Sequence, residues 1–221
     1  MLIAGELNLE VPDVSRDELT SFLQETETMH TNIPGMSREE VVYGYRNSRP
    51  YPWTRRILEV KGKSFYNYQT RKPFVDLMPV INQLPIIPET RVVLLLYQFE
   101  QPLYDFTWHF DRDDEYGFRL CIGLDTSKPF LEFGKMKEEF KDFAKEHTEK
   151  SVILEPGMVE EDKVYSIIPT KTNSIICING HRYCHRVPIV KASDRISIIV
   201  RGKLTTTEFD LIQKVEDELH S

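Results

Sequence analysis

The sequence predicts a mainly β protein with flanking helices, built as an antiparallel sandwich or jelly roll. Between residues 91 and 202 it contains several short segments rich in β-branched and aromatic residues, separated by turns. These segments do not alternate regularly with helices, which argues against a doubly wound parallel sheet. The expected strands are residues 91–99, 118–124, 163–169, 173–178 and 195–202.

The first ninety residues are expected to form a helical and irregular layer. Ser15 and Glu18 make a capping box before an apolar run, and Ser37 and Glu40 make a second one. Residues 73–84 carry apolar side chains at roughly helical spacing. We expect these helices to pack together as a layer.

Two further segments have helical patterns. Residues 136–150 are highly charged, and their apolar residues at i, i+3 and i+4 predict an amphipathic helix or a mobile insertion. Residues 203–221 are expected to form a terminal helix. No repeat or Gly/Ser linker interrupts the chain, so we expect a single domain over residues 1–221 with a β core at 91–202.

Charge and composition exclude several classes. The chain has 28 basic and 35 acidic residues, a net charge of −7, which argues against a nucleic-acid or anionic-lipid partner. No stretch approaches the ~20 apolar residues of a membrane helix, and Glu6 comes too early for a signal-peptide core. Cys121, Cys177 and Cys184 form no CxxC pair. We expect a cytoplasmic protein with reduced, buried cysteines; the sequence leaves the oligomeric state open.

Three residues could bind one metal ion. His109 and Asp111 stand two apart beside a predicted strand, and side chains at i and i+2 of an extended chain share a face. His185 follows seventy-four residues after Asp111, before another predicted strand. Two imidazoles and one carboxylate form the facial triad that suits Fe(II) and leaves positions open for substrate atoms and dioxygen.

A candidate carboxylate receptor follows. Arg195 stands ten residues after His185, and Ser197 two residues further, so both would project from the same face of their strand. A guanidinium and a hydroxyl together suit a carboxylate.

The pattern HxD, distal His and RxS over about residues 90–202 resembles the signature of the Fe(II)/2-oxoglutarate-dependent oxygenases. Within that superfamily, HFDRDDEYGFRLCIGL (109–124) resembles the aspartyl/asparaginyl β-hydroxylase-like branch, which includes bacterial proline and amino-acid hydroxylases. In that branch an arginine opens the apolar strand after the ligand histidine, and Arg119 corresponds to it. The animal aspartyl hydroxylases lack the metal carboxylate, so the presence of Asp111 is similar to the amino-acid-hydroxylating relatives.

The resemblance implies a double-stranded β-helix, also called a jelly roll or cupin, over residues 91–202. It implies Fe(II) as cofactor, 2-oxoglutarate and dioxygen as cosubstrates, and hydroxylation of an unactivated C–H bond with release of succinate and CO2. The implied metal ligands are His109, Asp111 and His185. The implied 2-oxoglutarate-binding residues are Arg195, Ser197 and Arg119.

Three of these assignments have a nearby competitor of the same chemistry: His181 for His185, Arg201 for Arg195, and Asp113 or Asp114 for Asp111. His181 lies fourteen residues before Arg195, whereas the family interval is ten. Arg201 lacks a serine two positions later.

Several residues are candidates for substrate binding. Residues 43–56 contain arginines and aromatics without an acid, which suits a lid over a carboxylate-bearing substrate or a surface loop with packed aromatics. Tyr97 is a further candidate pocket wall. Trp108 is another, but its strand parity is opposite to that of the ligands, which is more typical of a core residue. The candidates in the arginine-rich stretch are Arg46, Arg49, Trp53 and Arg55.

The leading hypothesis is a hydroxylase of a free amino acid or related small carboxylate. One alternative is a hydroxylase of an Asp, Asn or Pro side chain in a peptide or protein. An alternative of another class is a non-catalytic cupin-fold module that binds a metal or a carboxylate. A nucleic-acid demethylase is opposed by the net charge of −7.

Overall fold

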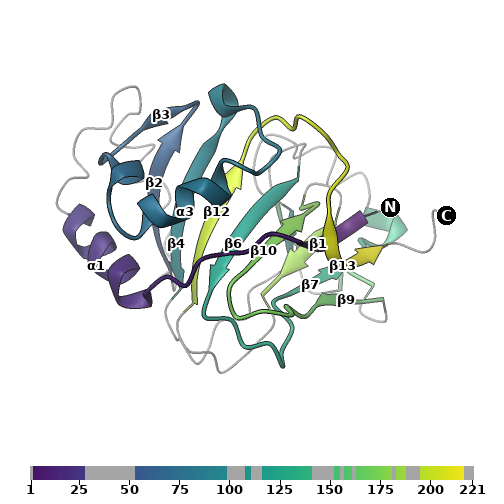
Figure 1. Ribbon diagram of the computed structural model, residues 1–221. Coiled ribbons are helices and arrows are strands. Elements are labelled where there is room, and N and C mark those ends of the chain that lie inside the picture. The colour runs from purple at the N-terminus through teal and green to yellow at the C-terminus, as the bar shows by residue number, and fades with distance from the viewer. Residues whose placement is uncertain are drawn as a thin grey trace.

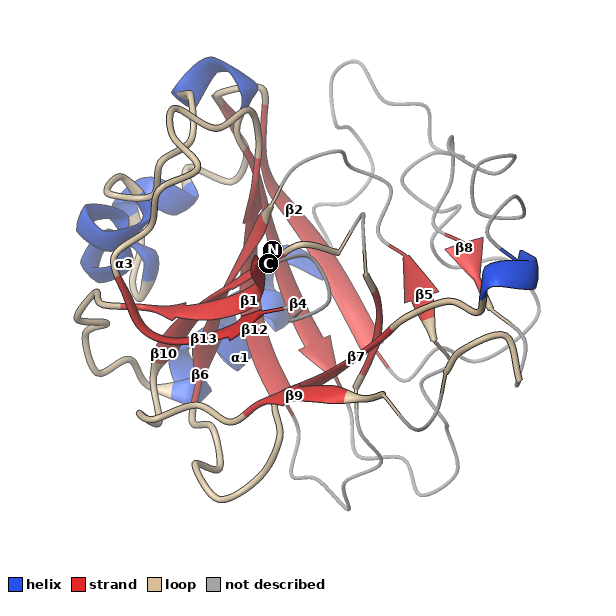
Figure 2. Ribbon diagram, turned by 90° about the vertical axis from the view of Figure 1, so that its right-hand side faces the viewer, coloured by secondary structure: helices blue, strands red, loops and turns tan. Residues whose placement is uncertain are grey.

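A computed structural model describes most of the chain and shows two antiparallel sheets (Figures 1 and 2). The described residues are 2–27, 53–98, 108–110, 116–140, 152–154, 157–160, 163–180, 183–187 and 195–216. Within these ranges the side chains of residues 53–55, 97–98, 152–153 and 195 lie outside the description.

The larger sheet has the strand order β13-β1-β10-β6-β12-β4-β2-β3. Its strands are β1 (Leu2–Leu7), β2 (Trp53–Val60), β3 (Lys63–Ser64), β4 (Val92–Gln98), β6 (Gly117–Ile122), β10 (Ser174–Ile178), β12 (Arg195–Arg201) and β13 (Leu211–Glu216).

The smaller sheet has the order β8-β5-β11-β7-β9 and lies on the side of the larger sheet away from α3 (Figure 2). Its strands are β5 (His109–Phe110), β7 (Leu131–Gly134), β8 (Val152–Ile153), β9 (Tyr165–Ile167) and β11 (Cys184–Arg186).

The path of the chain between the sheets is that of a double-stranded β-helix. Strands β4, β6, β10 and β12 belong to the larger sheet, and β5, β7, β9 and β11 to the smaller one, so the chain crosses between sheets at every step except from β7 to β9. β12 then pairs with both β4 and β6, and β11 with both β5 and β7. This is a jelly roll, and the predicted fold class is confirmed.

The five strands expected from residue type are present as β4, β6, β9, β10 and β12. Four of them form the middle of the larger sheet, apart from β9. Strands buried on both faces consist of near-continuous apolar residues, which makes them the easiest to recognise in a sequence.

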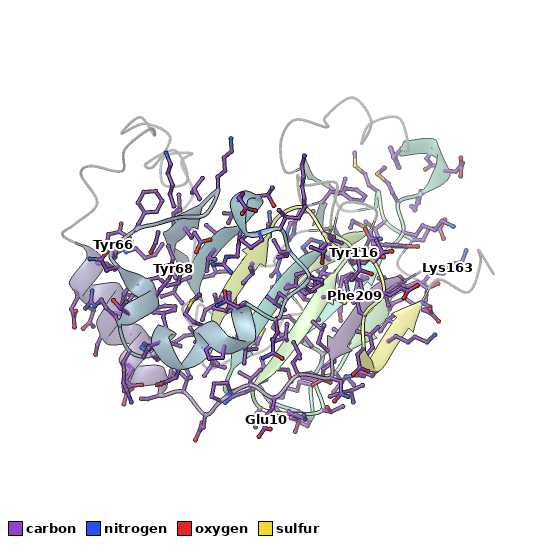
Figure 3. The ribbon with its side chains drawn as sticks, turned by 45° about the horizontal axis from the view of Figure 1, so that its top comes forward. Glu10, Tyr66, Tyr68, Tyr116, Lys163 and Phe209 are labelled. Carbon is purple, nitrogen blue, oxygen red and sulfur yellow. The ribbon has the colours of Figure 1, made fainter. Side chains whose placement is uncertain are left out.

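The expected terminal helix over residues 203–221 is wrong. Residues 211–216 form β13, an edge strand that pairs with β1 and alternates between half-buried and exposed positions. Before it, Phe209 packs its ring 5.2 Å from that of Tyr116 and 5.8 Å from that of Phe118 (Figure 3). The apolar residues 211, 212 and 215 fit a helical period as well as a strand, and pairing with β1 decides between them.

The N-terminal layer is helical, as expected, but it also contributes β1, β2 and β3 to the larger sheet. Its helices are α1 (Arg16–Glu27) and α3 (Phe74–Ile81), with the 3-10 turns η1 (Tyr68–Thr70) and η2 (Pro88–Thr90). The Ser15 hydroxyl accepts a hydrogen bond from the Glu18 N–H at 3.4 Å, so Ser15 caps the start of α1, as the first predicted capping box requires. The second, at Ser37 and Glu40, lies outside the described residues. Of residues 136–150, only 136–140 are described, with the 3-10 turn η3 (Glu138–Phe140).

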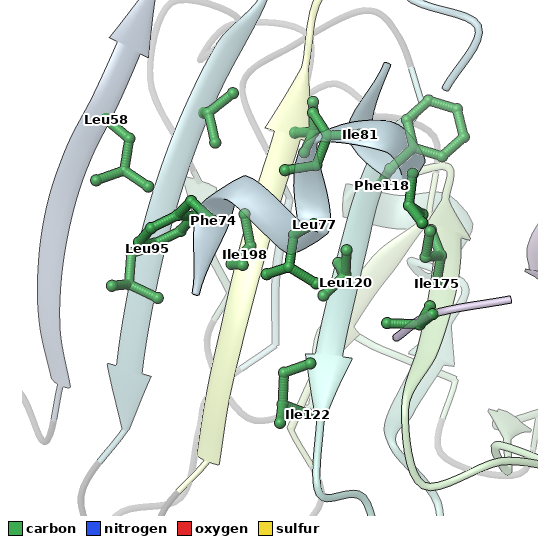
Figure 4. Close-up of a cluster of buried hydrophobic side chains, with 14 of the residues drawn as sticks. Leu58, Phe74, Leu77, Ile81, Leu95, Phe118, Leu120, Ile122, Ile175 and Ile198 are labelled. Atoms are coloured by element: carbon green, nitrogen blue, oxygen red, sulfur yellow. The ribbon is translucent and has the colours of Figure 1, made fainter. Parts of the chain in front are cut away.

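The helix α3 covers the outer face of the larger sheet. Phe74, Leu77 and Ile81 are fully buried there and belong to one cluster with strand residues such as Leu95 and Leu120 (Figure 4). Because successive strand residues point to opposite faces, the residues between these face the smaller sheet. The helices therefore close one face and leave the other to the interior between the sheets.

A buried charge network attaches this layer to the sheet. Glu59 on β2 is fully buried and accepts hydrogen bonds from the Tyr68 hydroxyl at 2.7 Å and from Gln69 at 3.0 Å. Arg91 donates to the same carboxylate at 2.7 Å and to Asn82 at 2.8 Å. Burial, followed by the bond to Glu59, raises the pKa of Tyr68. Every charge in this network has a partner, as buried charges require.

Among the described helices, none is both long enough and apolar enough to span a membrane.

Glu6 on β1 connects the first strand of the chain to β10 and to the last strand, β13. It is 1% exposed and accepts hydrogen bonds from the Ser174 hydroxyl at 2.6 Å, the Thr170 N–H at 2.9 Å and Gln213 at 2.7 Å. Burial by itself would raise the pKa of Glu6, but these hydrogen bonds to the ionised form outweigh it and hold the pKa below the ordinary 4.5.

We expect the free energy of unfolding to fall when acid protonates Glu6. Because the folded pKa is lowered, the ionised carboxylate stabilises the fold above the ordinary pKa, and this contribution is lost as the pH falls through the folded pKa. Urea unfolding of the unaltered protein and of Glu6→Gln, between about pH 6 and pH 3, checks this. The stability gap between the two proteins should narrow at low pH; a constant gap would contradict the assignment.

Candidate functional site

Two of the three predicted metal ligands meet between the sheets. His109 on β5 and His185 on β11 are directly opposite each other in the antiparallel register. Their ring centroids are 4.3 Å apart, with an angle of 51° between the ring planes. Seventy-six residues separate them in the chain, so the fold brings them together.

The histidine pair is largely buried and has an aromatic neighbour. His185 is fully buried, and His109 is partly buried. Phe133, opposite His185 on β7, places its ring centroid 6.1 Å from the imidazole. A buried site of this kind limits the access of water, and charges in it interact more strongly than in solvent.

A buried arginine from the larger sheet reaches the same space. Arg119 on β6 is 8% exposed, and its Nη2 lies 3.4 Å from Nε2 of His185. A guanidinium can only donate, so this contact is a hydrogen bond when Nε2 carries the lone pair. An imidazole nitrogen in that form is also the one that binds a metal ion. The structure thus brings Arg119 and His185 together, as well as the two histidines.

The predicted RxS pair lies on β12. Ser197 is buried and pairs with Cys121 of β6 and Leu96 of β4. Its neighbours Ile196 and Ile198 belong to the outer cluster beneath the helices, so strand alternation turns Ser197 toward the interior. Arg195 starts the same strand, in register with Gln98, and its side chain lies outside the description.

The other predicted site residues fall wholly or partly outside the described part of the chain. Trp53 and Arg55 lie on β2 and Tyr97 on β4, and only their backbone is described. Those wholly outside are Asp111, Arg46 and Arg49, together with the competitors His181, Asp113 and Asp114.

The described donors fit a transition metal that prefers imidazole. Two imidazoles from adjacent strands could supply two of the three ligands of a facial triad, and in the sequence Asp111 follows directly after Phe110, the last residue of β5. Within the described ranges no group of three metal-binding side chains is found. The third ligand of the triad therefore stays a prediction.

Trp108 lies on the opposite side of the smaller sheet from the histidines. It is 4% exposed and packs in a cluster with Met136, Leu154, Val159 and Cys184. This position favours the core role for Trp108 over a place in the substrate pocket.

Gly134 makes room for that indole. A Cβ at Gly134 would lie 2.4 Å from Cγ1 of Val159 and 3.2 Å from the six-membered ring of Trp108. The ring therefore rests directly on the backbone of β7.

Arg186 lies on the face of the smaller sheet opposite the histidines, and no motif in the sequence points to it. Cζ of Arg186 is 4.3 Å from the centroid of the Trp108 ring, and its Nε donates to Glu132 at 2.7 Å. Arg186 follows His185 and Trp108 precedes His109, so alternation alone places both on the face away from the site. The sequence shows this alternation, but it does not show the strand order that brings Trp108 and Arg186 together.

Comparisons with known proteins find likenesses to solved structures. No protein-family model matches the chain, and no curated protein matches its sequence. A crystal structure of EvdO2 from Micromonospora carbonacea var. aurantiaca complexed with 2-oxoglutarate is similar at 12% sequence identity and a TM-score of 0.40. The match covers 84% of this chain and 81% of that one. The fold assignment above rests on the strand order of this chain itself.

We expect Gly134→Ala to destabilise the protein by about 1–3 kcal/mol, because the new methyl group overlaps the stiff Val159 side chain and displaces Trp108. Chemical denaturation measures this. Gly117→Ala is the matched control, since a Cβ there has no neighbour closer than 3.8 Å. Equal stability of the two variants would contradict the packing described.

Proposed function

We propose that this protein is an Fe(II)/2-oxoglutarate-dependent oxygenase that hydroxylates a free amino acid or a related small carboxylate. The observation that carries the proposal is the meeting of His109, His185 and the buried Arg119 inside a double-stranded β-helix. Metal ligands from two adjacent short strands, with a cation beside them, are what a metal-chelated dicarboxylate requires.

The metal-binding residues of the proposal are His109, His185 and Asp111. When bound, the ferrous ion supplies the dioxygen activation that hydroxylates an unactivated C–H bond, while 2-oxoglutarate is converted to succinate and CO2. The chain's part is to present neutral imidazoles, and the contact from Arg119 favours a lone pair on Nε2 of His185.

Arg119 is proposed to bind a carboxylate of the cosubstrate. Once Nε2 of His185 is a metal ligand, the guanidinium of Arg119 needs another acceptor. A carboxylate next to the metal provides a charge-assisted one. Because Arg119 is buried, this pair would be only weakly screened by solvent.

Arg195 and Ser197 are proposed to bind the distal carboxylate. Arg119 is opposite Ile199 in the sheet, and Arg195 is four residues from Ile199 along β12, about 13 Å in an extended strand. An arginine side chain and a five-carbon dicarboxylate together can span that distance. Ser197 lies between Arg195 and Ile199 on β12 and is turned inward. It is proposed to add a hydrogen bond to the same distal carboxylate.

The interior on this side is lined by apolar residues, which exclude water from the site. Leu94, Leu96 and Ile199 are each at most 6% exposed and form a separate cluster next to Arg119 on the inner alternation of the larger sheet. Exclusion of water protects a reactive centre from side reactions.

The substrate part of the proposal rests on the resemblance of residues 109–124 to the amino-acid-hydroxylating relatives. The arginines at 46, 49 and 55 and the aromatic Trp53 are proposed to contact the substrate. Hydroxylation of an Asp, Asn or Pro side chain in a peptide is the alternative with the same chemistry.

We expect succinate release when the purified protein is mixed with Fe(II), ascorbate, 2-oxoglutarate and free amino acids. His109→Ala and His185→Ala should abolish this turnover, because each removes a metal ligand. Arg71→Gln, in the N-terminal layer against Phe22, is the control, and circular dichroism checks the fold of all three variants.

Turnover with peptides alone would overturn the preference for a free amino acid. Retained turnover in either ligand variant would overturn the metal assignment. An anaerobic complex with Fe(II) and 2-oxoglutarate that persists in oxygen with every substrate would show a binding module instead.

We expect Arg195→Ala chiefly to raise the 2-oxoglutarate concentration needed for half-maximal turnover. A lost charge-assisted pair of about 1.5–3 kcal/mol corresponds to a rise of roughly 10- to 100-fold. Arg201→Ala, at the other end of β12, is the comparison. An unchanged requirement in Arg195→Ala would move the role to Arg201 or Arg119.

A further inference from the structure

We propose that Arg186 is a positioning residue that holds β5 in register, so that His109 faces His185. It does this from the opposite face of the smaller sheet, by stacking on Trp108 while Glu132 holds its guanidinium. The inference rests on the proposed function, because it assigns a support to the proposed metal site.

Backbone pairing holds β5 only weakly to β11, although β5 also pairs with β8 on its other side through two register pairs. The strand has two residues, and its pairing with β11 is a single register pair, His185 with His109. A shift of one residue in a strand turns all its side chains to the other face. Such a shift would turn His109 out of the site and Trp108 into it.

Trp108 resists that shift from behind. Its indole packs against the backbone at Gly134, two strands away on β7, and its carbonyl accepts the Leu154 N–H at 2.8 Å. Within the described part of the chain its ring N–H has no hydrogen-bond partner. Packing and the guanidinium of Arg186 therefore orient the ring.

Arg186 connects the three strands. Its guanidinium lies 4.3 Å over the Trp108 ring, a cation–π distance, and bonds to Glu132, which is directly opposite it on β7. The side chain is 30% exposed and that of Glu132 is 20% exposed. Arg186 thus links β5 to β7 across β11, behind the strand that carries His185.

The two faces of β5 and β11 are coupled through adjacent residues. Trp108 precedes His109, and Arg186 follows His185. The outer pair can stack only when β5 has the register that sets the two imidazoles opposite each other. A cation–π contact on one face thereby fixes a ligand pair on the other.

Anaerobic titration with Co(II), followed by its d–d absorption, measures the affinity of the site. We expect Arg186→Gln to raise the Kd for Co(II) roughly 10-fold, the low end of the effect measured for residues that support metal ligands. Arg186→Lys keeps a cation over the ring and should recover part of the affinity. Glu132→Gln should weaken binding, and adding it to Arg186→Gln should bring little further loss, because the two act as one unit.

The chain offers a matched control in Arg71. It lies 5.0 Å from the centroid of Phe22, forms an ion pair with Glu25, and is 33% exposed, close to Arg186. Arg71→Gln removes the same kind of stack and ion pair from the N-terminal layer. We expect it to leave the Co(II) Kd unchanged.

Amide hydrogen exchange of Leu154 in the metal-free protein provides a second readout, because its N–H bonds to the Trp108 carbonyl. Exchange should be faster in Arg186→Gln than in Arg71→Gln. If the unaltered protein binds no Co(II), the proposed function fails, and Leu154 exchange still decides whether Arg186 holds β5. If it binds and Arg186→Gln binds equally tightly, the positioning role is overturned.

Discussion

The alternation of side chains along β5 and β11 is the constraint on which the candidate site depends. Each of these short strands presents a histidine to the interior and an aromatic or basic residue to the outer cluster. Because alternation is a property of extended backbone, the site and its support are parts of one arrangement. A shift of one residue in register would turn a histidine to the outer face and its outer neighbour to the site.

The larger sheet uses the same property on a bigger scale. Phe118 and Leu120 pack beneath the helices, while Arg119 between them reaches His185. The apolar residues on the outer face stabilise the sheet. This stabilisation offsets the free-energy cost of burying a guanidinium on the inner face. The sheet is thus both the core of the protein and one wall of the proposed site.

The buried carboxylates outside the candidate site stabilise the fold. Glu59 with Arg91 fastens the helical layer, and Glu6 fastens β1 to β10 and β13. Hydrogen bonds within the protein satisfy both carboxylates. They take no part in the proposed chemistry.

The sequence by itself determined the central strands, the first capped helix and α3, because a buried apolar run and a capping box are local features. It also indicated which residue types could form a metal site, since HxD and RxS are local spacings in the chain. The C-terminal strand and the short strands β5 and β11 needed the tertiary structure: residues 211–216 suit a helix equally well until β1 offers an edge. The pairing of His109 with His185, and of Trp108 with Arg186, was decided only by strand order, because these residues lie far apart in the chain and meet when β11 pairs with β5 in the smaller sheet.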